Sequence, residues 1–263
     1  MNDALGDRMK IYEGQESERR FLPLLPVMAR LDGRSFSRFT KGLARPFDKR
    51  LSDLMVDTAL HLLNTTTAVC GYTQSDEITM AWYAGTPKSQ IFFDGRIQKM
   101  VSSLAASASV EFNRLLGERI PEKQGFYPTF DCRVWQVPTL TEAVNTFLWR
   151  ELDATKNSIS MAAFEHYSHK ELMGKSGDEK QEMLWQKGIN WNDYPDSFKR
   201  GTYVQRRVTW GTISDLGDLP PQHHARSNPG MLYRRCKPMR LALPPLAKVS
   251  NPVEVIFEGK EPV

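Results

Sequence analysis

The sequence that decides the fold is Ala68-Val-Cys-Gly-Tyr-Thr-Gln-Ser-Asp-Glu-Ile-Thr-Met-Ala-Trp-Tyr83. Residues 68–72 and 78–83 are short apolar runs typical of strands, and residues 73–77 form a polar connection between them. A polar connection this short is typical of a β-hairpin. We therefore predict two neighbouring strands with Asp76 in the turn between them.

Helices are predicted on both sides of this hairpin. Apolar residues recur at helical spacing from Leu51 to Leu63 and again from Ile97 to Leu115, which is the pattern of an amphipathic helix. Two further strand-like runs lie outside these helices, at 24–31 and at 130–137. The order β-α-β-β-α-β is that of the ferredoxin-like split unit, so the predicted fold class is α+β.

Two zones follow this core, which spans residues 1–138. Residues 139–210 are predicted to be mainly helical, beginning at the capping-box pattern Thr139-Leu-Thr-Glu142 and ending in a strand or hairpin arm near 203–210. We assign them to the same unit as the core. Residues 211–263 contain eight of the sixteen prolines, so we expect an irregular extension draped over the body.

The composition indicates an ordinary globular protein. The 263 residues are 40% hydrophobic and 25% charged, which argues against wholesale disorder. No apolar run approaches the roughly 18 residues of a membrane-spanning helix, and the first residues lack the pattern of a secretory signal. The three cysteines are too few and too scattered for a disulfide framework or a zinc site. We expect a cytoplasmic protein with no membrane partner.

Basic residues are concentrated toward the C-terminus. The formal net charge is +4, which is compatible with a nucleic-acid partner. The segment 219–253 has no acidic residue and holds these basic ones: Arg226, Arg234, Arg235, Lys237, Arg240 and Lys248. Two interpretations are equally open, a surface that follows phosphates through electrostatics and a solvated, loop-rich tail.

Two acidic residues stand where the predicted topology brings strands together. Asp32 ends the first strand, and Asp76 lies in the hairpin turn. The first and third strands of a β-α-β-β-α-β sheet are central neighbours, so these carboxylates can converge. Converging carboxylates are ligands for Mg²⁺, and two such ions clamp the attacking and leaving oxygens of a nucleotidyl transfer. On spacing alone, ordinary capping or turn roles are the more common explanation.

Four segments resemble, in order, the motifs of the tRNA-His guanylyltransferase family. They are Arg30-Leu-Asp-Gly-Arg-Ser-Phe-Ser-Arg-Phe39, Tyr72-Thr-Gln-Ser-Asp-Glu77, Phe130-Asp-Cys-Arg-Val134 and Trp149-Arg-Glu-Leu-Asp-Ala-Thr-Lys-Asn157. The resemblance runs over about residues 3–207 and implies a polymerase-like palm, with 1–138 as its catalytic core and 139–210 as part of the same catalytic unit.

The resemblance also implies an activity. Members of the family are Mg²⁺-dependent nucleotidyltransferases, with two ions expected, that add nucleotides to a tRNA 5′ end in the 3′-to-5′ direction. ATP first activates the 5′-monophosphate, and the 3′-hydroxyl of GTP or another NTP then attacks it. A homo-oligomer, a tetramer in the family, is the implied assembly.

Each matching residue takes a role from the resemblance. Asp32 and Asp76 are the implied catalytic metal ligands, joined by Gly33 through its backbone carbonyl. Glu77 is expected to point to the opposite face of its strand, so its role stays open. The residues implied to bind nucleotides are Asp32, Gly33, Arg34, Ser35, Phe36, Ser37, Arg45, Asp48, Ser75, Asp76, Arg96, Lys99 and Asn157. Those implied to bind RNA are Arg133, Arg150, Asp153 and Lys156.

Within the nucleotide set the implied tasks differ. Residues 34–37 would cradle a triphosphate, whereas Arg45 and Asp48 would lie near a second one. Arg96 and Lys99 would hold phosphates at the start of a helix. An exposed helix face is the alternative for this last pair.

This chain departs from the eukaryotic members of the family in the helical motif. Thr155 stands where they carry His, and Ser158 and Met161 stand where they carry Asn. These differences favour a guanylyltransferase-like branch that repairs truncated tRNA 5′ ends opposite a template. Two alternatives remain open: a strict tRNA-His guanylyltransferase that adds a single G, and a catalytically silent palm domain that binds RNA or nucleotides.

Overall fold

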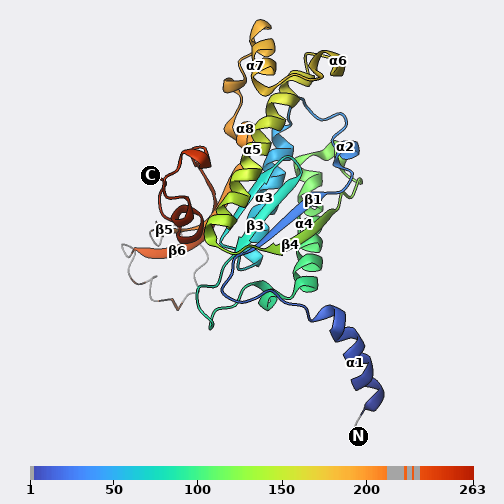
Figure 1. Cartoon of the computed structure of the whole chain (residues 1–263), viewed down its shortest axis with the longest axis vertical. Helices are drawn as coiled ribbons and strands as arrows, with labels where there is room; N and C mark the ends of the chain where they lie inside the picture. The colour runs from blue at the N-terminus through green and yellow to red at the C-terminus, as the bar shows by residue number, and fades with distance from the viewer. Residues whose placement is uncertain (1–2, 212–221, 224–226, 228–231) are drawn as a thin grey trace.

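The computed structural model describes residues 3–211, 222–223, 227 and 232–263 (Figure 1). The strands are β1 (Val27–Gly33), β2 (Cys70–Gln74), β3 (Glu77–Trp82), β4 (Phe130–Gln136), β5 (Thr202–Gly211) and β6 (Tyr233–Leu241). The α-helices are α1 (Ala4–Ser17), α2 (Phe36–Phe39), α3 (Lys49–Thr65), α4 (Ile97–Arg119), α5 (Leu140–Phe164), α6 (His169–Leu172), α7 (Gly177–Gln186) and α8 (Asp196–Arg200). Short helical turns occur at Phe92–Gly95, Pro121–Lys123, Trp191–Asp193, Leu246–Lys248 and Glu254–Glu258.

These strands form one antiparallel sheet in the order β4-β1-β3-β2-β5-β6. From β1 to β4 the structure confirms the predicted order β-α-β-β-α-β, and β1 and β3 are neighbours as expected. Asp32 of β1 is paired in register with Glu77 of β3 and Asp131 of β4. Because directly paired residues share a face of the sheet, these acidic side chains lie on one face at the end of the sheet.

Helices cover both faces of the sheet (Figure 1), and the alternation along β1 shows why. Ala29 and Leu31 are buried against α3 and α4, whereas Met28 packs on the other face with Phe147 of α5. Successive residues of a strand point to opposite faces. The face that carries Asp32 is therefore the one that α5 covers.

Residues 139–210 form the predicted helical part. Thr139 caps α5 by accepting a hydrogen bond from the N–H of Glu142 at 3.1 Å, as the capping pattern predicts. A small buried cluster joins α5, α6 and α7. Within the described residues, no helix combines the length and apolar character needed to cross a membrane.

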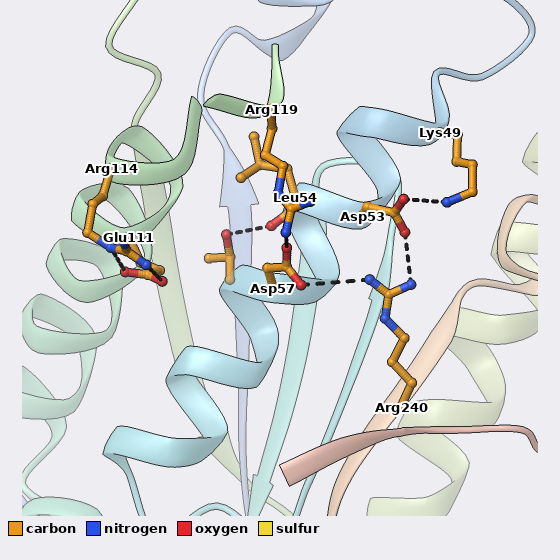
Figure 2. Close-up of polar contacts among 9 residues, drawn as sticks. Lys49, Asp53, Leu54, Asp57, Glu111, Arg114, Arg119 and Arg240 are labelled. Atoms are coloured by element: carbon orange, nitrogen blue, oxygen red, sulfur yellow. Dashed lines mark hydrogen bonds and ion pairs between the residues drawn. The ribbon is translucent and has the colours of Figure 1, made fainter. Parts of the chain in front are cut away.

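The C-terminal region is more regular than its proline content suggested. All nine residues of β6 pair with β5, so this segment extends the sheet. Arg240 of β6 lies 2.8 Å from Asp53 and 3.7 Å from Asp57 of α3 (Figure 2). Asp57 also accepts a hydrogen bond from Arg119 of α4 at 2.6 Å. Arg240 is thus engaged in fastening β6 to the helices.

The helix α1 has no counterpart in the sequence prediction. It projects from the body of the molecule (Figure 1), and none of its residues is buried. A helix that buries no face needs no apolar periodicity, so the sequence carried no signal for it. Leu5, Ile11 and Tyr12 are exposed on its surface.

Candidate active site

Asp32 and Asp76 come together where β1 ends beside the β2–β3 turn. The N–H of Gly33 donates a hydrogen bond to the carbonyl of Asp76 at 3.0 Å, which holds the two segments side by side. Burial raises the pKa of the Asp76 carboxyl, and the negative charge of Asp32 raises it further. The structure therefore brings the two carboxylates into one electrostatic environment, as the topology predicted.

The donor groups at this point suit a hard cation. Two carboxylates and the backbone carbonyl of Gly33 offer oxygen ligands, which Mg²⁺ prefers. The Asp76 carboxylate accepts a hydrogen bond from the Ser75 hydroxyl at 3.1 Å, and a cation would neutralise its partly buried charge. In the described part of the chain, no group of three or more His, Cys, Asp or Glu side chains is arranged around one metal position. The other ligands of a Mg²⁺ ion would then be phosphate oxygens and water.

Residues 34–37 form a tight connection from β1 into the short helix α2. Ser35 has a φ of +57° and directly precedes this helix, a left-handed conformation that is uncommon for residues other than Gly and that clusters at functional sites. Arg34 and Ser37 are exposed beside it. The N–H of Arg34 donates to the carbonyl of Thr129 at 2.8 Å. The other N–H groups at the start of this helical turn and the Arg34 guanidinium are the groups that suit phosphate oxygens.

Phe36 lies in the core, although it belongs to this loop. Its ring packs on Phe39, Phe112 and Phe130 at centroid distances of 5.1, 5.5 and 5.2 Å, so only its backbone can face a triphosphate. The same ring explains Gly33, because a Cβ atom at that position would lie 2.3 Å from Cδ2 of Phe36. Packing therefore requires the glycine that the resemblance assigned to the metal site.

A pocket of about 210 Å³ opens beside the turn that carries Asp76. Phe47 and Phe198, whose rings stack at a centroid distance of 4.7 Å, supply part of its apolar wall. Ser75, Arg45 and Asn157, all predicted to bind nucleotides, also line it. Apolar walls with a few polar groups are typical of a small-molecule site, and a nucleobase fits that description.

Asp48, predicted to lie near a second triphosphate, holds the loop before α3 in place. Its carboxylate accepts hydrogen bonds from the N–H of Ala44 at 3.2 Å and from the N–H and side chain of Arg50 at 2.9 and 2.7 Å. The Arg50 side chain in particular lowers the pKa of Asp48 to about 2. Asp48 lines the pocket, but its oxygen atoms are already engaged in shaping the pocket wall.

Glu77 lies on the same face of the sheet as Asp32, so the expectation that it points away from the metal site was wrong. Glu77 and its sequence neighbour Asp76 were expected to point to opposite faces. Cross-strand pairing, however, sets Glu77 directly opposite Asp32. Arg150 of α5 donates two hydrogen bonds to Glu77, at 2.7 and 2.9 Å, and also lies 3.2 Å from Asp153. Burial raises the pKa of Glu77, and the charges of Arg150 and Arg30 offset part of that effect. The pair fixes α5 against the end of the sheet.

The residues predicted to bind RNA are therefore in different environments. Arg150 is buried and Asp153 is half-buried beside it, so this part of the helix faces the sheet. Lys156 is exposed on the same helix. Arg133 is exposed on β4 and lies 3.8 Å from Asp32, which leaves it well placed to meet a phosphate near the carboxylates.

Arg96 and Lys99 lie at the opposite end of the sheet from the Asp32–Asp76 pair. A β-bridge joins Arg20 to Arg96, so the start of α4 lies beside the chain that enters β1. The seven residues of β1, a length of about 20 Å, separate the two ends. Within one chain these basic residues do not reach the carboxylates. The sequence held the signal, because β3 runs away from the turn and the following helix must begin at its far end.

Comparisons with known proteins agree on one family. The family model described as "Thg1: tRNAHis guanylyltransferase" matches residues 6–138. An uncharacterized protein of Acanthamoeba polyphaga mimivirus is 30% identical over an alignment of 223 residues, and the match covers 74% of this chain and 76% of that protein. The tRNA(His) guanylyltransferase of Debaryomyces hansenii is 28% identical over an alignment of 236 residues, and the match covers 83% of this chain and 87% of the yeast protein.

Solved structures show the same relationship. A bacterial tRNA(His) guanylyltransferase (Thg1)-like protein in complex with ATP has a TM-score of 0.72 and 38% sequence identity, covering 77% of this chain and 88% of its own. A bacterial Thg1-like protein in complex with GTP has a TM-score of 0.73 and 30% identity, covering 94% of this chain and 95% of its own. Both resemble this chain in their mixed helical and antiparallel-sheet architecture.

These matches show that the chain is a nucleotidyltransferase. In enzymes of this class, a pair of acidic residues beside the nucleotide pocket can hold the metal ions that the transfer needs. It belongs to the Thg1 family, the tRNAHis guanylyltransferases. The resemblance inferred from four sequence motifs is thereby confirmed, and the matched segment contains both Asp32 and Asp76.

Proposed function

We propose that this protein repairs the 5′ end of a tRNA by adding nucleotides in the 3′-to-5′ direction opposite a template. The observation that carries the proposal is the meeting of Asp32 and Asp76 between the exposed loop 34–37 and the pocket that Asn157 lines. The bacterial relatives, solved in complex with ATP and with GTP, support these two nucleotides as substrates. The tRNA(His) guanylyltransferase names of the curated relatives support tRNA.

The reaction we propose has two steps. An oxygen atom of the tRNA 5′-monophosphate attacks the α-phosphorus of ATP, and pyrophosphate leaves. The 3′-hydroxyl of the incoming NTP then attacks the activated 5′-phosphorus, and AMP leaves. Mg²⁺, when bound, would stabilise negative charge on the reacting phosphate oxygens.

The residues of this chain bind and orient the reactants. Asp32, Asp76 and the carbonyl of Gly33 would hold the cation, as their oxygen donors allow. The loop 34–37 offers N–H groups and a guanidinium to the triphosphate. Asn157 can donate and accept hydrogen bonds at the base in the pocket. Holding two reactants in a productive geometry lowers the barrier for both steps.

The chemistry of α5 supports base selection by the template. The Thr155 hydroxyl donates to the carbonyl of Glu151 at 3.0 Å, and the Ser158 hydroxyl donates to the carbonyl of Thr155 at 2.8 Å. Hydroxyl groups bonded within their own helix offer few directional contacts to a base. Met161, which lines the pocket, adds an apolar surface. Pairing with the opposite strand is then the main source of selectivity.

The experiment uses the full-length protein, ATP and Mg²⁺ with a tRNA that lacks its first 5′ nucleotide. Four versions carry C, U, A or G opposite the missing position, and each NTP is supplied separately. We expect the complementary nucleotide to be added in each case, as measured on sequencing gels. Addition of G alone, and only to tRNA-His, would establish the strict guanylyltransferase alternative. RNA binding with no addition would establish the silent domain.

We further propose that the protein is a homo-oligomer, a tetramer by resemblance to its family. The exposed apolar residues Leu5, Ile11 and Tyr12 of α1 support this assembly, since a projecting helix with such a surface suits contact with another copy. Light scattering on the intact protein and on a variant without residues 1–17 tests it. A monomeric mass for the intact protein would contradict the proposal.

A further inference from the structure

Trp149 is an exposed aromatic residue held in a fixed position near the carboxylates. It belongs to α5, and 53% of its surface is accessible. The guanidinium carbon of Arg150 lies 4.6 Å from the centre of its ring, and that of Arg30 lies 5.8 Å away. Guanidinium groups at these distances are attracted to the indole face. The ring is therefore ordered by its neighbours although it faces solvent.

The groups that hold the ring are themselves anchored. Arg150 donates two hydrogen bonds to Glu77 at 2.7 and 2.9 Å. Arg30 stays 3.9 Å from Glu77, and in the described part of the chain its buried Nε has no hydrogen-bond partner. Glu77 thus holds the Arg150 guanidinium by two hydrogen bonds. The Arg30 guanidinium makes no hydrogen bond to Glu77 and can still bind an anion. An ordered aromatic ring with such a cation beside it has the composition of a nucleotide-binding surface.

The surroundings of Trp149 lead toward the carboxylates. Arg30 precedes Asp32 by two residues on β1. The direct partner of Arg30 on β4 is Arg133. Both basic side chains therefore lie on the face of Asp32. Arg133 is exposed and lies 3.8 Å from Asp32. A phosphate that contacts these two guanidiniums would lie close to the metal ligands, and a base attached to it could reach the ring.

Trp149 and the pocket lie on opposite sides of the ion pair that anchors α5. Asn157, which lines the pocket, follows Trp149 by eight residues, a rise of about 12 Å along the helix. The contact between Arg150 and Glu77 lies between Trp149 and Asn157. Glu77 is the residue that is paired in register with Asp32. A transfer reaction needs one nucleotide on each side of the reacting phosphorus. The pocket suits the incoming nucleotide. The Trp149 ring is then available to the 5′-terminal nucleotide of the RNA, to which the incoming nucleotide is joined.

We propose that Trp149 stacks on the base of the 5′-terminal nucleotide of the RNA substrate, while Arg30 and Arg133 contact the phosphate of that nucleotide. The proposal deepens the proposed function and rests on it for the identity of the RNA. Stacking on an aromatic ring tolerates every base. The surface would therefore position any 5′ end without selecting its sequence, in keeping with template-directed addition.

The test measures RNA affinity and kinetics on the same set of variants. The probe is an acceptor-stem RNA hairpin with a 5′-monophosphate, lacking one 5′ nucleotide and carrying a 3′ fluorophore. A second hairpin has an abasic residue at its 5′ terminus. The variants are Trp149→Ala and Trp149→Phe, and the matched control is Trp185→Ala, because Trp185 is 63% exposed on α7. Fluorescence anisotropy gives the Kd, and gel assays give KM for RNA and for each NTP.

We expect Trp149→Ala to weaken binding of the intact hairpin by about 5- to 150-fold, the range of aromatic stacking on one base. KM for RNA should rise by the same factor, with KM for NTP unchanged. Trp149→Phe should stay within a few-fold of the original protein, and Trp185→Ala should have no effect. The abasic hairpin should bind the original protein and Trp149→Ala equally weakly, because the base that stacks on the ring is missing.

Two results would overturn the assignment. One is a Trp149→Ala change that weakens binding of the abasic hairpin as much as it weakens binding of the intact one. The other is a rise in KM for NTP in place of KM for RNA, which would give the ring to the incoming nucleotide. If the original protein binds the hairpin but adds no nucleotide, the proposed function fails, while the anisotropy series still decides the role of Trp149.

Discussion

At the scale of single residues, packing and charge restrict which residue types the site can carry. Gly33 has no room for a Cβ atom because the Phe36 ring lies against it. Asp76 is partly buried beside Asp32, a placement that raises its pKa and that a protein retains where the charge has a use. Ser35 and Ser75 both have positive φ, at +57° and +50°, and flank these acids. Two of the strained backbone positions of the described chain therefore lie beside the proposed chemistry.

The first prediction concerns the two carboxylates. Asp32→Asn and Asp76→Asn should each reduce the rate of nucleotide addition by on the order of 1,000-fold or more, because each removes a cation ligand. Thermal melting in EDTA should give a Tm for Asp76→Asn at least as high as that of the original protein, because the change removes a partly desolvated charge that has a like charge beside it. Either variant keeping near-normal turnover in Mg²⁺ would refute the two-ligand assignment.

The second prediction concerns Asp48 and pH. The pKa of Asp48 falls from an ordinary 3.8 to about 2 in the folded protein, so the folded state binds this proton less tightly than the unfolded chain. Its stabilising effect is therefore complete above about pH 4 and is lost as the pH falls toward 2. The difference corresponds to at most about 2.5 kcal/mol, and solvent around the half-exposed Arg50 reduces it to about 1 to 2 kcal/mol.

Urea unfolding of Asp48→Asn against the original protein measures this effect. We expect the variant to be less stable by about 1 to 2 kcal/mol at pH 7 and at pH 5, with the gap narrowing below pH 4. Asp178→Asn, at an exposed position in the first turn of α7, is the control and should change stability by less than about 0.5 kcal/mol. A gap that is the same at pH 3 and pH 7 would contradict the assignment.

At the scale of elements, the sequence predicted those parts of the fold that bury a face. The strands β1 to β4 and the helices α3, α4 and α5 carry the periodicity of half-buried elements, and all are present. The strand β6 was missed because Tyr-Arg-Arg-Cys-Lys-Pro-Met-Arg-Leu, its sequence at 233–241, has no alternating apolar pattern. A strand at the edge of a sheet, largely exposed, has no need of one.

The candidate site divides in the same way. The convergence of Asp32 and Asp76 followed from the topology, since central strands have fixed neighbours. The contact between Glu77 and Arg150 did not follow, because it depends on which turn of α5 crosses the end of the sheet. The position of Trp149 against Arg30 has the same origin. Periodicity assigns a residue to a face of a helix but gives no register between a helix and a sheet.

The third prediction concerns the Arg150–Glu77 pair, which joins α5 to β3. Arg150→Met leaves Glu77 buried without its main partner and should cost about 3 kcal/mol of unfolding free energy. The double change Arg150→Met with Glu77→Leu should cost less than the sum of the two single changes, by about 1 kcal/mol or more. Urea unfolding of the four proteins gives the coupling. Asp153→Asn, at a half-exposed neighbour of Arg150, is the control, and additive effects of the first two changes would show that the pair is not an anchor.

At the scale of the whole molecule, two elements extend away from the body. One is α1, and the other is the outer part of the β5–β6 hairpin, residues 208–211 and 233–236, which we term the ribbon (Figure 1). Val208 and Trp210 are exposed on it. Among the described residues, no ion pair or hydrogen bond engages the side chains of Arg234, Arg235 or the adjacent Lys237. Arg226, which belongs to the same basic stretch of sequence, lies outside the described residues.

The fourth prediction is that these three cations follow the phosphates of the bound RNA. Changing Arg234, Arg235 and Lys237 to Gln should weaken RNA binding at low salt for every RNA sequence alike. It should also make the plot of log K against log salt shallower by about 0.7 to 0.9 for each phosphate that the variant no longer neutralises. Arg240→Gln is the matched control, because Asp53 and Asp57 already engage Arg240. Anisotropy between 50 and 300 mM KCl measures the slopes. Equal slopes for the triple variant and the original protein would show that Arg234, Arg235 and Lys237 belong to a solvated tail that does not contact RNA phosphates.

The ribbon also carries the most exposed of the three thiols. Cys236 of β6 is exposed, whereas burial raises the pKa of Cys70 and of Cys132 to about 12. Since maleimides react with thiolates, a dye added at neutral pH should attach to Cys236 alone. A single-site fluorescent derivative is thus available without removing any native cysteine. Energy transfer from this dye to one on the RNA would follow the approach of the ribbon during each cycle of nucleotide addition.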